Sequence, residues 1–357
     1  MARAVTMAES LAVREEPPAL VAPGSGRGAL ARLRNPFLAI WPATALLFAV
    51  SPLIADGSLR LSSLQSTLPF AGVLAIVGIG QTLVIQQRGL DLAVPGMISL
   101  AAIVVTRVAD GQGDRLLLAV LAALGACLAA GLVSAAAIVY LGITPLVATL
   151  AVNALLLGTI LKITSGSSTS TAPHALAAFA AHRILGFSTI VWLAVVLVAV
   201  VGLVSRRTVI GRRFTMIGTS PAAAYAAGYP VLRYRLITYC LAGLFYAIGA
   251  VLLAGYVRTP GLSAGDTYLL PSIAAVVLGG TSPAGGAGTV VGTLGGALFL
   301  TQLQQVVFGA GASQAVQLVI QAAAIGLGMA IRTVPWRQWL RPHRTATVPS
   351  VGGPLDA

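Results

Sequence analysis

Charged residues are scarce in this sequence. They make up 9% of the 357 residues, and only nine of them are Asp or Glu. Soluble domains carry about 25% charged residues, so this composition excludes a chain whose surface mainly faces water. The formal charge of +13 comes from arginines scattered between apolar segments. We therefore expect these charges to set membrane topology, and we expect no nucleic acid as a partner.

Residues that hold metals are also few. The two cysteines, Cys127 and Cys240, lie in separate apolar segments, and the three histidines lie in loops or near the C-terminus. This pattern predicts neither a metal site nor a disulfide framework. A Gly-rich phosphate loop followed by Lys is missing as well, so the chain cannot hydrolyse ATP by itself. We expect no cofactor, no metal and no enzymatic activity.

Apolar residues, in contrast, are abundant and form long runs. Hydrophobic residues make up 57% of the chain, with a mean hydropathy of +0.92, and many runs reach the roughly 17–25 residues of a membrane-spanning helix. The sequence predicts an all-α, polytopic membrane protein with about ten transmembrane helices, some of them short or broken. The segments lie near 36–55, 64–85, 92–109, 116–143, 145–163, 187–204, 236–257, 268–280, 289–308 and 315–331.

The basic residues predict how these segments are oriented. With the N-terminus inside, sixteen of the 22 basic residues fall on the cytoplasmic side, which is the bias of the positive-inside rule. Both termini are then cytoplasmic. We expect a flexible cytoplasmic tail over 1–35, a transmembrane domain over 36–332 with a long cytoplasmic loop over 205–235, and a second cytoplasmic tail over 333–357.

The eighth segment is too short to cross the membrane as a regular helix. Its thirteen residues, from Tyr268 to Gly280, would rise about 20 Å against a hydrocarbon core of about 30 Å. A Gly- and Pro-rich stretch continues to residue 288. Broken segments at membrane depth are typical of a transport path, which makes Gly279 and Gly280 candidates for its wall. A tight cytoplasmic turn between two ordinary spans is the alternative.

The sequence offers no internal source of energy for transport. Every acidic residue lies in a tail, in a loop or at a segment end, whereas proton-coupled carriers place ionisable groups within their spans. Transport is then passive, or another subunit drives it. The 205–235 loop favours a partner, because Ser220, Pro221 and Gly228 suit the cap, first position and stop of a short helix. Such a helix could dock on a partner or rest on lipid headgroups.

Four stretches resemble motifs of one family, in that family's order. Residues 89–94 are similar to its Gly-Ile-Asp-Leu-Ser-Val run, and residues 143–150 to its Ile-x-Pro-Phe-x-x-Thr-Leu run. Ile217, Gly218, Ala223, Ala224 and Gly228 resemble its coupling segment, and residues 273–297 resemble its most distinctive stretch. From about 64 to 332 the sequence looks like the permease subunits of ribose- and xylose-type ABC importers.

The resemblance implies a function and a set of partners. The chain would form the path for a monosaccharide or related small polar solute in the bacterial plasma (inner) membrane. Its partners would be a cytoplasmic ATP-binding subunit, an extracytoplasmic solute-binding protein and a second permease copy in a homodimer. Coupling to the ATPase would involve Ser220, Pro221, Ala223, Ala224, Gly228 and Tyr229. A nucleoside, a furanone-type signal or a branched amino acid is an alternative solute, and a stand-alone facilitator is an alternative function.

Asp91 and several amides are the remaining candidates for the path. We expect Asp91 to cap the third segment at its cytoplasmic end, with Arg88 as a local ion pair, and the resemblance adds that this cap borders the path. Amides can exchange hydrogen bonds with sugar hydroxyls, or they can bond across helices. The full set of path candidates is Asp91, Gln81, Asn153, Gly279, Gly280, Gln305, Gln314, Gln317 and Gln321.

Overall fold

The computed structural model describes residues 39–167 and 170–333, so the two predicted tails lie outside the described residues except for Thr333. The described residues form helices, loops and one small hairpin of two strands, β1 (Arg183–Ile184) and β2 (Phe187–Ser188). The first half holds α2 (Ile40–Ile54), α3 (Leu61–Gln86), α4 (Val94–Ala109), α5 (Leu116–Val139), α6 (Pro145–Thr164) and α7 (His174–Ala181). The second half holds α8 (Thr189–Arg207), α9 (Val209–Thr219), α10 (Pro221–Ala226), α11 (Val231–Val257), η2 (Asp266–Tyr268), α12 (Leu269–Leu278), α13 (Val290–Gly309) and α14 (Gln314–Thr333).

The helices confirm an all-α, polytopic membrane protein. Each of the ten predicted segments overlaps one helix, with η2 and α12 together matching the eighth. Six helices of the described part are long and apolar enough to cross a membrane: α3, α5, α6, α8, α11 and α13. The apolar parts of α2, α4, η2–α12 and α14 are shorter. The count of ten crossings and the cytoplasmic termini stay predictions.

Two long helices form the centre of the bundle. The C-terminal part of α3 is buried almost without interruption, and α11 packs against α3, α4 and α5. The helices α11 and α5 approach closely because glycines face the crossing: a Cβ at Gly131 would overlap the Tyr239 carbonyl, and one at Gly243 would overlap the Cys127 carbonyl. Such small-residue contacts let backbones pack tightly where no hydrophobic effect drives helices together. On the other side, α13 packs against α2, α3 and α12.

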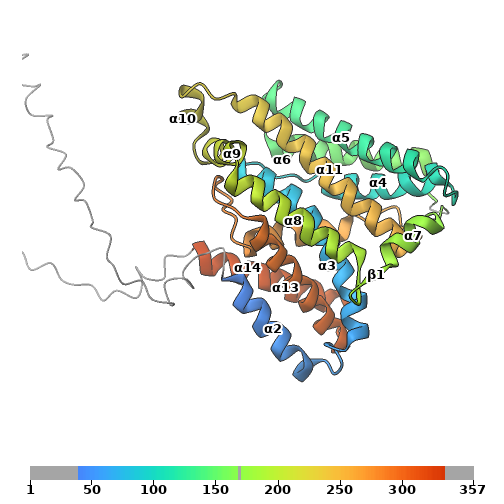
Figure 1. The fold of residues 1–357 in the computed structure, drawn as a ribbon. Helices are drawn as coiled ribbons and strands as arrows, with labels where there is room; N and C mark the ends of the chain where they lie inside the picture. Colours follow the sequence, from blue (N-terminus) through green and yellow to red (C-terminus); the bar gives the residue numbers. More distant parts are fainter. Residues whose placement is uncertain (1–38, 168–169, 334–357) are drawn as a thin grey trace, which may run out of the picture. The chain divides into compact units, whose positions relative to one another are not determined.

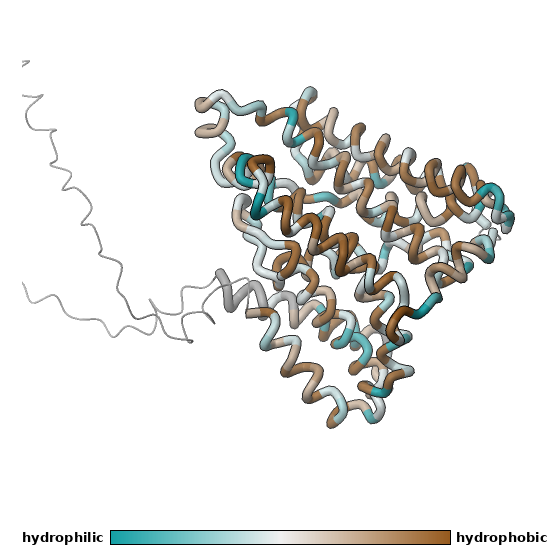
Figure 2. The backbone as a smooth tube through the Cα atoms, in the orientation of Figure 1, coloured by the Kyte–Doolittle hydropathy of each residue, from teal (hydrophilic) through white to brown (hydrophobic). Residues whose placement is uncertain are grey.

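Different short elements lie at the two ends of the bundle. The helices α9 and α10 lie at one end, and α7 lies with strand β1 at the other (Figure 1). Apolar residues follow the lengths of the long helices, whereas hydrophilic residues gather at the connections (Figure 2). Neither α7 nor α9 was expected from the sequence. The predicted short helix at Pro221 is confirmed as α10: Ser220 caps it, with Oγ accepting a hydrogen bond from Ala223 N at 3.4 Å.

Candidate functional site

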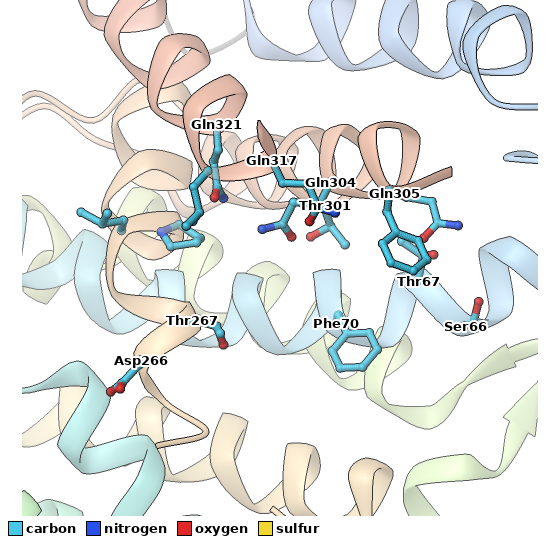
Figure 3. Close-up of a pocket in the computed structure, with 14 residues that line it drawn as sticks. Ser66, Thr67, Phe70, Asp266, Thr267, Thr301, Gln304, Gln305, Gln317 and Gln321 are labelled. Carbon is cyan, nitrogen blue, oxygen red and sulfur yellow. The ribbon is translucent and has the colours of Figure 1, made fainter. Parts of the chain in front are cut away.

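A polar chamber lies where α3, α12, α13 and α14 meet. Its volume is about 500 Å³, and amides, hydroxyls and two phenyl rings line it. Figure 3 shows Thr301 and Gln304 of α13, beside Gln317 of α14, facing the helix α3 that carries Thr67 and Phe70. The lining residues are Ser66, Thr67, Phe70, Asp266, Thr267, Leu270, Pro271, Thr301, Gln304, Gln305, Phe308, Gln317, Leu318 and Gln321. We call this cavity the outer chamber, because the predicted topology places it towards the extracytoplasmic side.

Three of the predicted path residues meet in this chamber. Gln305, Gln317 and Gln321 all line it, although they come from different helices. Gln321 is 6% exposed, and its Nε2 has no hydrogen-bond partner among the described residues. Gln317 donates its Nε2 to the Ala312 carbonyl at 3.3 Å. The side chain of Gln314 lies outside the described residues.

Several residues of the chamber were missed in the sequence. Thr301 and Gln304 share one face of α13 with the predicted residue Gln305, at i, i+3 and i+4, a spacing that could have indicated a polar stripe. Thr67 gave no such signal, because it is one of several polar residues at the start of α3 and the sequence does not show which of them face the partner helices. Asp266 is exposed at the rim and lies apart from the amides in Figure 3.

A second cavity, also of about 500 Å³, lies near the opposite end of α12. Its wall is mostly apolar, with Arg88 as its charged residue, and it joins three of the stretches that resemble family motifs. The lining residues are Ile85, Arg88, Gly89, Leu90, Thr144, Pro145, Leu146, Ile273, Val277 and Pro283. We call this cavity the inner pocket.

The short helix α12 contributes to both cavities. Leu270 and Pro271 line the outer chamber, whereas Ile273 and Val277 line the inner pocket. Ten helical residues rise only about 15 Å, so this helix cannot span the membrane alone. A movement of α12 would therefore change both cavities together.

Close backbone contacts hold the broken segment in place. Gly279 caps the end of α12, and a Cβ there would overlap the backbone of Gly292 in α13. A Cβ at Gly292 would in turn overlap the Gly279 carbonyl. Gly280 has φ +107°, a conformation that favours glycine. Both candidate glycines thus shape the turn after α12, and neither lines the two cavities.

Asp91 occupies a different position from the predicted one. The helix α4 begins at Val94 with Ala93 as its N-cap, so Asp91 lies two residues before the cap. Its Oδ1 accepts a hydrogen bond from Ala93 N at 2.9 Å, while its Oδ2 is buried without a partner among the described residues. Arg88 does not pair with it and instead donates to the Gly218 carbonyl at 2.9 Å. The expectations of a helix cap and a local ion pair were therefore wrong.

Burial dominates the electrostatics of Asp91. The residue lies in the 87–93 connection, outside the helices α3 and α4, yet it has no exposed surface. Loss of water raises the pKa of its carboxyl from 3.8 to about 6, against the opposing effect of the Ala93 hydrogen bond. The carboxyl is thus enclosed by protein and lines neither of the two cavities.

Two predicted path amides link the backbone of this connection and of the first turn of α4 to neighbouring helices. Gln81 accepts a hydrogen bond from the Tyr246 hydroxyl at 2.9 Å, and its Nε2 lies 3.4 Å from the Asp91 carbonyl oxygen. The Asn153 Oδ1 accepts a hydrogen bond from Gly96 N at 2.8 Å. These contacts correspond to the alternative role of amides as links between helices.

The predicted coupling residues surround α10 but do not share one face. Ala223 and Gly228 are exposed, and Ser220, Pro221 and Tyr229 are half-buried. Ala224 is buried, at 1% exposure, in a small cluster with Ile217 and Val231. Its small side chain therefore packs α10 against neighbouring residues of the protein, which the sequence did not indicate. Gly228 has φ +80°, as expected of a helix stop.

The fold and the two cavities are those of a polytopic, α-helical membrane permease, in which a short helix lines both an outer chamber and an inner pocket. The comparison with protein families agrees with this class. Residues 63–327 match the family described as "Branched-chain amino acid transport system / permease component". The chain belongs to this permease family.

Curated relatives cover most of the chain. The ribose import permease protein RbsC of Escherichia coli (strain K12) is 31% identical over 293 residues, which is 81% of this chain and 91% of that protein. The autoinducer 2 import system permease protein LsrD of Photorhabdus temperata is 30% identical over 288 residues, or 78% of this chain and 86% of that protein. No solved structure matches the chain.

Proposed function

We propose that this chain is the membrane-spanning subunit of an ATP-driven importer in a bacterial inner membrane, and that it forms the path for a monosaccharide or related polyol. The relatives are named as import permeases for ribose and for autoinducer 2, which supports a small hydroxylated solute. In this proposal a cytoplasmic ATPase supplies the energy, an extracytoplasmic binding protein delivers the solute, and two permease copies work as a homodimer.

The outer chamber is the observation that carries this proposal. Four amides and four hydroxyls converge on it from α3, η2, α13 and α14, and these groups both donate and accept hydrogen bonds as sugar hydroxyls do. Gln321 supports a ligand in particular, because a buried amide nitrogen without a partner is costly unless a solute or water satisfies it. Phe70 and Phe308 add apolar surface for the carbon face of a sugar ring.

Uptake measurements can test both the solute class and the energy source. Proteoliposomes would contain the permease with the proposed partner ATPase and binding protein, and labelled ribose would serve as the first probe. We expect uptake that needs ATP and the binding protein. Uptake that continues without the ATPase would instead favour the stand-alone facilitator. ATP-dependent uptake of leucine but not of any sugar would overturn the solute class.

The exposed side of α10 is the proposed ATPase contact. Ala223 is exposed there, so Ala223→Trp adds bulk to the docking surface and should abolish co-purification of the ATPase. Bulk at Ala224 would be a less selective test, because that position is buried and a larger side chain disrupts the cluster with Ile217. The matched control is the double substitution Arg212→Gln and Arg213→Gln, at exposed positions of α9. It should leave co-purification largely intact. Unchanged co-purification with Ala223→Trp would place the contact elsewhere.

Labelling can test the proposed topology of ten crossings with cytoplasmic termini. In a background without Cys127 and Cys240, cysteines at exposed Ser167 and Ser263 should react with an impermeant maleimide added to intact cells. Gly265, in the same loop, is unsuitable for labelling because it is buried and has no room for a side chain beside Pro95. Cysteine at Ala223 should react only after the cells are opened. External labelling of Ala223→Cys would reverse the topology.

A further inference from the structure

Arg88 adopts an unusual backbone conformation at the end of α3. Its φ is +61°, in the left-handed region that residues other than glycine rarely adopt. Its backbone N–H donates to the Ile85 carbonyl at 2.9 Å, which closes the turn after the helix. The turn directs the Arg88 side chain towards the cytoplasmic helices and away from Asp91, its expected partner.

The guanidinium of Arg88 binds the end of α9. Nε donates to the Gly218 carbonyl at 2.9 Å, and Nη2 donates to the Thr219 carbonyl. Carbonyls in the last turn of a helix lack intrahelical partners, and an arginine there also interacts favourably with the helix dipole. Ser220, the cap of α10, follows directly. Arg88 therefore fixes the two backbone carbonyls directly before the cap of α10, the proposed docking helix.

The stem of Arg88 packs against the loop that follows α12. A Cβ at Gly285 would overlap Arg88 Cγ, so this loop lies directly on the side chain. The backbone adds a second link, because Gly286 N donates to the Gln86 carbonyl at 2.8 Å. Gly218 completes the contact, since a Cβ there would overlap the same Gln86 carbonyl. Three segments that are far apart in the sequence thus meet at one arginine.

Arg88 also lines the inner pocket, together with Ile273 and Val277 of α12. One side chain therefore contacts the end of α9, where it leads into α10, and the loop after α12, and it lines the inner pocket. We propose that Arg88 is a positioning residue for coupling: it transmits displacement of α9 and α10 to the loop after α12 and thereby changes the inner pocket. This inference rests on the proposed function, because it takes α10 as the site where the ATPase docks.

The principal test uses Arg88→Lys in the reconstituted importer. Lysine keeps the inside charge but lacks the forked geometry that reaches two carbonyls at once. We expect normal membrane levels, normal ATPase co-purification and normal basal ATP hydrolysis. The rise in hydrolysis caused by the binding protein with ribose, and ribose uptake itself, should fall about tenfold or more, in line with the loss of two charge-assisted hydrogen bonds. Arg233→Lys, at an exposed arginine in α11, is the matched control.

Two other outcomes with Arg88→Lys would overturn the proposal. Uptake equal to that of the unchanged protein would mean that Arg88 serves only as a topology charge. A parallel loss of ATPase co-purification would mean that it only shapes the docking surface. Failure of the unchanged protein to show any stimulated hydrolysis or uptake would count against the proposed function itself, which separates the two failures.

A second measurement covers the case in which Arg88→Lys does not reach the membrane. Thr219 contacts Gly286. Thr219 and Ala287, the residue after Gly286, are both exposed. Cysteines at these two positions can be joined by a short thiol-reactive cross-linker in a background without Cys127 and Cys240. Because the proposal makes the end of α9 and the loop after α12 move together, we expect the cross-linked importer to retain both its ATPase and its uptake. Loss of uptake on cross-linking that reduction of a cleavable linker restores would show that the two segments must move apart, and the proposal would be wrong.

Discussion

The outer chamber and the inner pocket have similar volumes, about 500 Å³ each, but they are built differently. Side-chain amides and hydroxyls line the outer chamber, and none of its residues needs an unusual backbone conformation. Around the inner pocket, Arg88 and Gly285 have positive φ, and backbone groups of separate loops bond to one another. The outer side offers exchangeable hydrogen bonds to a solute, whereas the inner side fixes the relative positions of three loops.

Because the two cavities are built differently, substitutions at the outer chamber and at the inner pocket should have different effects. Polar side chains can be replaced at the outer chamber without disturbing the backbone, so their loss should affect the solute more than the fold. Backbone contacts at the inner pocket leave no space for a new methyl group, so added bulk should affect movement and assembly. Loss of polarity at the outer chamber and added bulk at the inner pocket therefore test this difference between the cavities.

The largest effect should follow from bulk at the inner pocket. A Cβ at Gly218 would overlap the Gln86 carbonyl, so Gly218→Val should separate α9 from the end of α3 and abolish uptake. Gly158 on the exposed side of α6 has open space around it, and Gly158→Val is the matched control with the same added volume. Ribose uptake and membrane level check both variants. Equal uptake by the two variants would show that the inner loops tolerate bulk, and the comparison would fail.

A smaller effect should follow from lost polarity in the outer chamber. The double change Gln304→Leu and Gln305→Leu keeps the volume of both side chains but removes two amides from the lining. Each lost hydrogen bond is worth about 1 kcal/mol, so we expect uptake to fall about tenfold or more at low solute concentration. Thermal stability in detergent should hardly change.

Gln302 offers the matched control for this change, because it lies on the same helix but links helices. Its Nε2 donates to Ser51 Oγ of α2 at 2.9 Å, and the side chain is buried outside the chamber. Gln302→Leu should therefore lower thermal stability and the amount of folded permease, with normal uptake for each folded molecule. If the double change lowers stability and Gln302→Leu lowers uptake, the roles assigned to these amides are reversed.

The sequence predicted the helices better than the site, and the reason is physical. Apolar runs report burial in the membrane along one segment, and each of the ten expected runs overlaps a helix. The cap, first position and stop of α10 were also local signals, carried by Ser220, Pro221 and Gly228. The helix α9 was missed because its apolar residues, such as Val209 and Ile210, stand among arginines rather than in a long run.

The site depends on contacts between distant segments, which no local pattern encodes. Thr67 and Gln304 lie on different helices and meet only in the folded bundle. Gln81 and Asn153 look like path amides in the sequence, yet they hydrogen-bond to Tyr246 and to the Gly96 backbone. Arg88 looked like a partner for Asp91 because the two are three residues apart. The positive φ of Arg88, which directs its side chain elsewhere, became evident only in the structure.

The smallest effect should come from the change of Asp91 to asparagine. Asparagine keeps an oxygen that can accept the Ala93 N–H, so Asp91→Asn should reduce uptake by no more than about twofold. Leucine keeps the size but cannot accept this bond, so Asp91→Leu should lose most of the uptake. Equal and severe losses in both variants, at normal membrane levels, would show that the charge itself is needed.

The pH dependence of stability gives a separate measurement on the same residue. Burial raises the pKa of the Asp91 carboxyl from 3.8 to about 6, so the folded protein binds more protons than the unfolded chain between these values. Its contribution to stability is therefore greatest at low pH and decreases as the pH rises from about 4 to about 6. Asp91→Asn cannot titrate, and we expect its melting temperature in detergent to decrease less over this range and to be higher than that of the unchanged protein at pH 7. An identical pH dependence in the two proteins would mean that the carboxyl finds a partner that stabilises its charge, and Asp91 would then belong to the inner pocket's network of hydrogen bonds.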